Sequence, residues 1–321
     1  RSIILDQSGN AFTSTVTMQA GNGSNATFDN ITFVDSADVR LHSSAASAGD
    51  LFINASTDLA VGGDLSITAT TGDITQGGAL TITGTTTLVT LADNATIDLK
   101  VNSIVNAFTG KLLITTNDTG SETDGDVEID GGDTNLILGT STIDGDLEIV
   151  SGGTITDAVG ETVTIRGTIS ATTDANDSDI TLDSLEVGGI SLLVPNGTGA
   201  VTIVNANGID FVAMTVRGNL IATATTGNIT QTGALTITGT STLVTSADNA
   251  TITLNDGGNT FTGKLLITTN DTGLETDGDV AIDGGTTNLI LGASTIDGDL
   301  ALRSGGTITD DGIATVRGTL T

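Results

Sequence analysis

The sequence has no Cys, no Trp, no Tyr, one His and one Pro among its 321 residues. Without Cys there is no disulfide framework, no cysteine nucleophile and no thiolate metal site. A single His excludes a multi-histidine metal centre and argues against imidazole catalysis. Aromatic residues make up only 2% of the chain, and all of them are Phe. The chemistry of any site must therefore come from carboxylates, amides and hydroxyls.

Basic residues are also scarce, because 9 Lys and Arg face 39 Asp and Glu and leave a net charge of −30. A chain this acidic repels nucleic acid and anionic membranes, so neither is expected as a partner. No apolar run approaches the roughly 20 residues that span a bilayer, and no signal peptide is recognisable. The 37% of hydrophobic residues nevertheless favours a folded chain over a disordered one.

The chain repeats itself at an offset of about 155 residues. Residues 68–99 return almost unchanged at 223–254, and residues 107–157 return at 260–310. An earlier stretch resembles part of the same unit. The repeats predict a degenerate partial unit over 1–60, a first full unit over 61–215 and a second, truncated unit over 216–321, joined as one continuous solenoid.

Each unit contains a shorter motif: Gly, a polar residue, an apolar residue, any residue and a second apolar residue. It reads GDLSI at 63–67, GKLLI at 110–114 and GDLEI at 145–149. Apolar and polar residues alternate with a period of two, as in half-buried strands, and no helical period persists. The sequence predicts an all-β protein, a parallel β-solenoid with about 15–22 residues per coil and about 16 coils. Tandem immunoglobulin-like sandwiches are the rival fold, and the lack of Trp and Tyr argues against them.

The two units indicate which positions face the core. Leu147 and Ile149 align with Leu300 and Leu302 and remain aliphatic, whereas the residue between them changes from Glu to Ala. Alternate aliphatic positions are therefore predicted to be buried and the intervening ones to face water.

The phrases GDLSI, TGDIT and GALTITG over most of residues 49–321 resemble filamentous-haemagglutinin-type repeats of bacterial adhesins and exoproteins. This resemblance implies a right-handed parallel β-helix, export to the cell surface or beyond, and an adhesive or fibrous role. The secretion domain of that family is not apparent in the sequence.

Asp recurs in Gly-containing turns as TDGD and IDGD, each phrase twice. Ca²⁺ takes several hard oxygen ligands from carboxylates and turn carbonyls, and stacked coils would bring such turns together. The alternative is that Asp and Gly simply form good turns and keep the chain soluble. The calcium candidates are Asp124, Asp126, Asp144, Asp146, Asp277, Asp279, Asp297 and Asp299. No other cofactor is indicated.

Three Phe residues occupy matching Asn-x-Phe-Thr phrases. These are Phe12, Phe108 and Phe261, and core packing is the expected role. The sequence indicates no catalytic residues, and we expect no enzyme activity.

We expect a structural, extracellular or cell-surface fibre or adhesin stalk. The chain stops in the opening strand of a coil, at 316–321, which favours either a longer repetitive chain or end-to-end pairing with another copy. Two alternatives are an adhesin that binds glycans or other surface molecules directly, and a β-helix polysaccharide-degrading enzyme.

Overall fold

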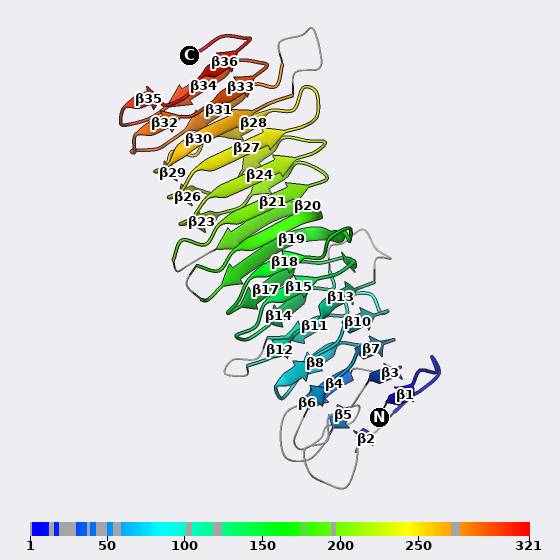
Figure 1. The fold of residues 1–321 in the computed structure, drawn as a ribbon. Coiled ribbons are helices and arrows are strands. Elements are labelled where there is room, and N and C mark those ends of the chain that lie inside the picture. The colour runs from blue at the N-terminus through cyan, green and yellow to red at the C-terminus, as the bar shows by residue number, and fades with distance from the viewer. Residues whose placement is uncertain are drawn as a thin grey trace. The chain divides into compact units, whose positions relative to one another are not determined.

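A computed structural model gives the fold of the chain (Figure 1), which is an all-β, parallel β-solenoid of about 11 turns. None of the described residues lies in a helix. No helix in the described part of the chain is long and apolar enough to cross a membrane. The structure describes residues 2–12, 16–18, 30–36, 39–42, 50–53, 59–100, 105–117, 124–175, 177–193, 197–270 and 277–321.

The chain divides into two compact units, Arg1–Gly167 and Thr168–Thr321, and each is described by itself. The boundaries predicted from the sequence repeats, after residues 60 and 215, remain predictions. The strands that begin in the first unit are β1 (Ile3–Leu5), β2 (Val16–Met18), β3 (Ile31–Asp35), β4 (Val39–His42), β5 (Asp50–Ile53), β6 (Leu59–Val61), β7 (Leu65–Ala69), β8 (Ile74–Gln76), β9 (Leu80–Ile82), β10 (Thr86–Thr90), β11 (Ile97–Leu99), β12 (Ala107–Phe108), β13 (Lys111–Thr115), β14 (Val127–Asp130), β15 (Leu136–Leu138), β16 (Ser141–Ile143), β17 (Leu147–Ser151), β18 (Ile155–Asp157) and β19 (Val163–Thr173).

The second unit continues in the same style. Its strands are β20 (Ile180–Leu193), β21 (Val201–Asn205), β22 (Ile209–Phe211), β23 (Met214–Val216), β24 (Leu220–Ala224), β25 (Ile229–Gln231), β26 (Leu235–Ile237), β27 (Ser241–Thr245), β28 (Ile252–Leu254), β29 (Thr260–Phe261), β30 (Lys264–Thr268), β31 (Val280–Asp283), β32 (Leu289–Leu291), β33 (Ser294–Ile296), β34 (Leu300–Arg303), β35 (Ile308–Asp310) and β36 (Ala314–Val316).

Neighbouring coils pair in parallel and in register. Thr86 of β10 lies between Leu65 of β7, 21 positions earlier, and Leu112 of β13, 26 positions later. The stacked strands β21, β24, β27 and β30 of the second unit follow one another in the same way (Figure 1). Parallel pairing on both sides supplies each inner strand with partners for its backbone amides and carbonyls.

The expectation of about 16 coils is too high, because it assumes one copy of the five-residue motif per coil, whereas a single coil can contain two copies. GKLLI at 110–114 forms β13 and GDVEI at 125–129 forms β14, yet these strands pair with β10 and β11 of the same preceding coil. One coil therefore carries the motif on two of its sides. Some coils keep the predicted spacing, such as the 20 positions from Val127 to Leu147, whereas longer turns extend others.

The core is a stack of aliphatic side chains, as the alternation predicts. Val127, Ile129, Leu147 and Ile149 are at most 1% exposed. Their counterparts in the second unit are also buried, except for Leu302, which is half-buried. Burial of small branched side chains supplies most of the driving force for folding in a chain with so few rings.

The Phe positions agree with the expected packing role. Phe108 and Phe261 are each 1% exposed. Phe12 is half-buried and stacks on Phe33, with 5.3 Å between the ring centroids. The matching Asn-x-Phe-Thr phrases therefore fix equivalent ring positions in the two units.

Candidate functional site

Asp and Asn side chains in the turns bond each coil to the next. Oδ1 of Asp64 accepts the backbone N–H of Thr85 at 2.8 Å, and Oδ1 of Asn219 accepts that of Thr240 at 2.9 Å. Asp and Asn are equivalent acceptors here, so the bond does not require the charge. We term this series the turn ladder, and it recurs 19 to 23 positions apart at Asp73–Thr96, Asp126–Asp146, Asn135–Thr154, Asp179–Ala200, Asn228–Thr251, Asp279–Asp299, Asn288–Thr307 and Asp299–Thr319.

Four of the eight predicted calcium candidates belong to this ladder. Oδ1 of Asp126 accepts the backbone N–H of Asp146 at 2.8 Å, and Asp279 does the same for Asp299. The structure thus brings each of these pairs together, as stacking of the turns predicts. We term them the outer pairs. In each of them, one carboxylate oxygen accepts a hydrogen bond from the backbone of the next coil.

The other four candidates form the inner pairs, Asp124 with Asp144 and Asp277 with Asp297. The carboxyl groups of Asp124 and Asp144 lie within hydrogen-bonding reach of each other. Asp144 is fully buried, its backbone N–H donates to Oγ1 of Thr116 at 2.8 Å, and its Oδ1 pairs with the Arg166 guanidinium. Gly125, at φ 75°, follows Asp124 in a left-handed conformation that favours glycine.

The second inner pair repeats this geometry. Asp297 is also fully buried, receives the Arg317 guanidinium on Oδ1, and donates its backbone N–H to Oγ1 of Thr269 at 2.9 Å. Burial alone would raise the pKa of Asp297, but the hydrogen bond and charge of Arg317, together with hydrogen bonds from Asp277, outweigh it and hold that pKa below its usual range. Gly278, at φ 72°, follows Asp277.

The half-buried member of each inner pair is electrostatically strained. Burial raises the pKa of Asp124, and the neighbouring Asp93 carboxylate raises it further. Burial also raises the pKa of Asp277, followed by the charge of Asp248. Both groups lie where negative charge is already in excess.

Two surface carboxyl groups have lowered pKa values. The Lys111 side chain beside Glu161 holds the pKa of that carboxyl below its usual range. Hydrogen bonds from the backbone and side chain of Thr198 lower the pKa of Asp177. In both cases the partner stabilises the ionised form.

Acidification is therefore expected to act in two opposite ways. Asp124 and Asp277, with raised pKa values, destabilise the fold at pH 7, and stability is regained as pH falls through their folded-state values. Glu161, Asp177 and Asp297, with lowered pKa values, contribute stability above their unfolded values, and it is lost as pH falls further. Melting followed by circular dichroism should show a midpoint that holds or rises from pH 7 to about 4 and falls below it. A midpoint that rises continuously to pH 2 would contradict this.

Replacing Asp126 by Asn should leave stability nearly unchanged, because the amide oxygen accepts the same N–H of Asp146. Asp126→Ala should lose about 0.5–1.5 kcal/mol, the net contribution of one hydrogen bond. Urea denaturation of the two variants measures the difference. Equal losses in both would mean that the charge, and not the ladder bond, matters at this position.

A buried Asn–Gln network also joins the coils and was not anticipated from the sequence. Oδ1 of Asn106 accepts the backbone N–H of Leu80 at 2.9 Å, and its Nδ2 donates to the carbonyls of Leu99 and Asp130 at 3.2 and 2.7 Å. The side-chain amides of Asn106 and Gln76 also bond to each other reciprocally. Asn106 thus connects the backbones of successive coils.

The same network recurs in the second unit. Asn259 bonds reciprocally with Gln231 and to the backbones of Leu235, Leu254 and Asp283. Its signal in the sequence was the invariant Asn of the Asn-x-Phe-Thr phrases together with the repeated Ile-Thr-Gln.

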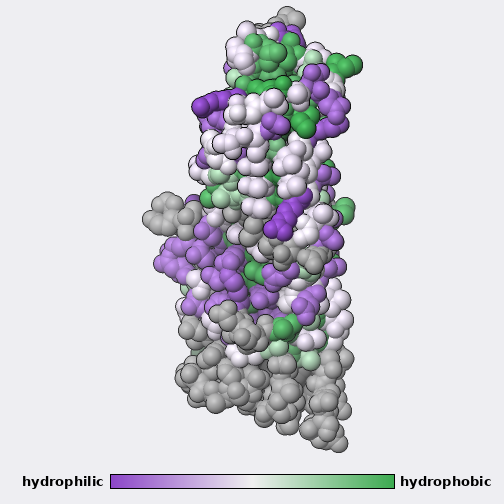
Figure 2. Space-filling model, turned by 90° about the vertical axis from the view of Figure 1, so that its left-hand side faces the viewer, coloured by the Kyte–Doolittle hydropathy of each residue, from purple (hydrophilic) through white to green (hydrophobic). Residues whose placement is uncertain are grey.

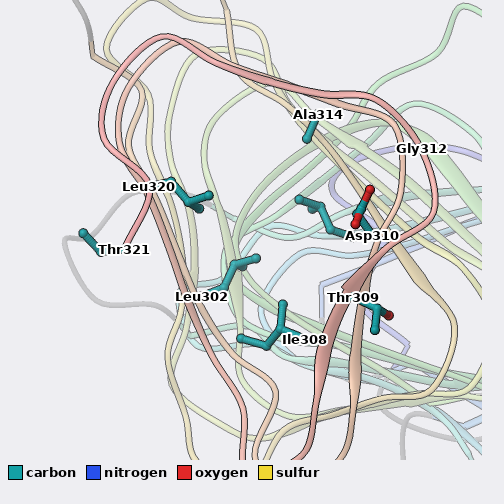
Figure 3. Close-up of a pocket in the computed structure, with 9 residues that line it drawn as sticks. Leu302, Ile308, Thr309, Asp310, Gly312, Ala314, Leu320 and Thr321 are labelled. Atoms are coloured by element: carbon teal, nitrogen blue, oxygen red, sulfur yellow. The ribbon is translucent and has the colours of Figure 1, made fainter.

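One open pocket of about 510 Å³ lies among β32, β34, β35 and β36 (Figure 3). Asp310 is its one carboxylate, whereas glycoside hydrolysis normally uses two. The pocket is therefore an apolar surface without an acid–base pair. Its lining residues are Leu291, Leu302, Ile308, Thr309, Asp310, Gly312, Ala314, Leu320 and Thr321.

Outward positions of the strands are mostly small and polar. Thr215, Thr236 and Thr260 follow one another in register on β23, β26 and β29. On the face in Figure 2, hydrophobic residues gather near the upper end, and elsewhere they are scattered among hydrophilic and intermediate residues. Within the described residues, no group of three or more His, Cys, Asp or Glu side chains has the arrangement of a metal site. Calcium binding by the eight candidates remains a prediction.

These features define the chain as a β-solenoid repeat protein. It belongs to a family described as repeats of unknown function (DUF5649), whose model matches residues 37–115, 124–186, 198–268 and 277–321. The matched ranges are shorter than the long repeats and do not share their bounds, because the first begins at residue 37 and the third spans the predicted boundary after residue 215. Searches of curated proteins and of solved structures gave no significant match.

Proposed function

We propose that the chain is a structural segment of an extracellular or cell-surface fibre or adhesin stalk, in which the solenoid acts as a stiff, acidic spacer. The observation that carries this proposal is the in-register stacking of coils over an aliphatic core in both units. Such a stack resists bending and stretching without disulfides, because both the backbone and the core continue from coil to coil.

The side-chain bonds between coils support the same role. The turn ladder and the two Asn–Gln networks add a bond from each coil to the next, and they recur along both units. Carboxylates in the turns keep a long β surface soluble and oppose lateral clumping. The resemblance to filamentous-haemagglutinin-type repeats adds to the proposal of a secreted or surface-bound fibre.

A further copy of the repeat is the partner that this architecture favours. Parallel strand pairing extends a solenoid by simple addition, either within a longer repetitive chain or end to end between chains. Direct binding of glycans or other surface molecules is the second candidate function, and the in-register Thr residues on the sides of the coils are the feature that favours it.

Electron microscopy of the purified chain tests the main proposal. Narrow rods or fibres are expected, and rounded particles would overturn the spacer role. A glycan array separates the two candidates, because a spacer gives no specific signal. Reproducible binding to one glycan class would replace the spacer by the adhesin.

A further inference from the structure

We propose that the two inner pairs are cation sites, each binding one divalent ion of the calcium type between its carboxyl groups. The sites are Asp124 with Asp144 in the first unit and Asp277 with Asp297 in the second. This proposal is independent of the fibre role.

The first observation is the placement of oxygen atoms. Oδ2 of Asp144 is buried and has no hydrogen-bond donor among the described residues, and the same holds for Oδ2 of Asp297 and Oδ1 of Asp277. Each inner pair brings two carboxyl groups within hydrogen-bonding reach, although two carboxylates repel each other. Buried oxygens without donors are costly, and a cation between the two groups would satisfy them.

The second observation is the local charge. In the first pair, Asp124 interacts with the carboxylates of both Asp93 and Asp144, and the Arg166 guanidinium pairs with Asp144. Carboxylates gathered in this way favour a cation beside them. Burial is the main cause of the raised pKa of Asp124, and the neighbouring carboxylates raise it further.

The second unit repeats this arrangement with different positions in the chain. Asp277 interacts with the carboxylates of both Asp248 and Asp297, and the Arg317 guanidinium pairs with Asp297. Each arginine pairs with Oδ1 of its aspartate, which leaves Oδ2 buried without a hydrogen-bond partner among the described residues. The second arrangement follows from the sequence repeat, because residues 107–157 return at 260–310.

The chemistry of the ligand atoms indicates which ion would bind. Carboxylate oxygens suit hard cations, and sites without His or Cys do not favour zinc or copper. Ca²⁺ accepts irregular geometry and completes its shell with water, whereas Mg²⁺ demands a regular octahedron. Two carboxylates per ion predict weak binding, with Kd of about 10⁻⁴–10⁻³ M, the range of extracellular modules.

Equilibrium dialysis and thermal melting at pH 7.5 with CaCl₂ test the proposal, with NaCl at matched ionic strength as the reference. We expect about two bound ions per chain and a rise in the melting midpoint. The double variant Asp124→Asn/Asp277→Asn should abolish both effects while folding normally, because the Asn amide can donate to the partner carboxylate.

The matched control is Asp126→Asn/Asp279→Asn, which removes the same charge from the outer pairs and should retain calcium binding. Loss of binding in this control alone would place the ions on the outer pairs and overturn the proposal. Absence of any calcium effect, together with stabilisation of the unmodified chain between pH 7 and 5, would show that each inner pair shares a proton instead. Absence of both effects would overturn the proposal as well.

Discussion

Asn106→Ala should lower the free energy of unfolding by about 3–5 kcal/mol, because it leaves several buried polar groups without a hydrogen-bond partner at once. The Leu80 N–H and the carbonyls of Leu99 and Asp130 lose their side-chain partner, and the Gln76 amide loses its reciprocal bonds. Each orphaned buried group costs about 1–3 kcal/mol, with partial relief from relaxation. Urea denaturation followed by circular dichroism measures the loss.

Asn135→Ala is the matched control. Asn135 also bonds to the next coil, but only through the N–H of Thr154 at 2.9 Å, so its loss should be about 1 kcal/mol. Asn259→Ala in the second unit should behave like Asn106→Ala, because its five bonds are the same. A loss near 1 kcal/mol for Asn106→Ala would show that water replaces the network.

Arg166→Met should cost about 2–4 kcal/mol, because it leaves the Asp144 carboxylate buried without its guanidinium. Breaking one side of a fully buried pair typically costs about 3–5 kcal/mol. One third of the Arg166 side chain is exposed, at 33%, which brings the expectation below that range. The measurement is again the unfolding free energy at pH 7.

The double variant Asp144→Asn/Arg166→Met should recover most of this loss, because no uncompensated charge is then buried. Arg217→Met is the control. Arg217 precedes Gly in the same Val-Arg-Gly phrase as Arg317 but is exposed, so its replacement should cost less than about 0.5 kcal/mol. Equal losses for Arg166→Met and Arg217→Met would refute the role of the buried pair.

The alternation of apolar residues was enough to predict the fold and most of its core. Leu147 and Ile149 are buried as their aliphatic identity in both repeats indicated, because a strand that faces water on one side has a period of two. The number of coils was not predictable in the same way. A motif marks the start of a strand, and the number of strands in one coil depends on where the chain bends, which the motif does not encode.

The candidate site was predicted in composition and only partly in arrangement. Stacking of TDGD and IDGD turns correctly places Asp126 beside Asp146. The division into inner and outer pairs depends on the turn at the intervening glycine, such as Gly125 at φ 75°, because residues two apart in a regular strand would share one face. The arginine comes from a phrase about 20 positions later. The Asn–Gln network was missed because a buried amide reads, in a sequence, like any turn residue.

The turn ladder makes the single coil the natural unit of change in length. Each ladder bond joins one coil to its neighbour and spans about one coil of sequence. Insertion or deletion of a whole coil therefore keeps each Asp or Asn acceptor opposite a backbone N–H of the next coil. Insertion or deletion of a few residues moves the acceptor away from that N–H. A chain built in this way can grow or shrink in whole coils by recombination between similar segments, and each product inherits a complete set of bonds.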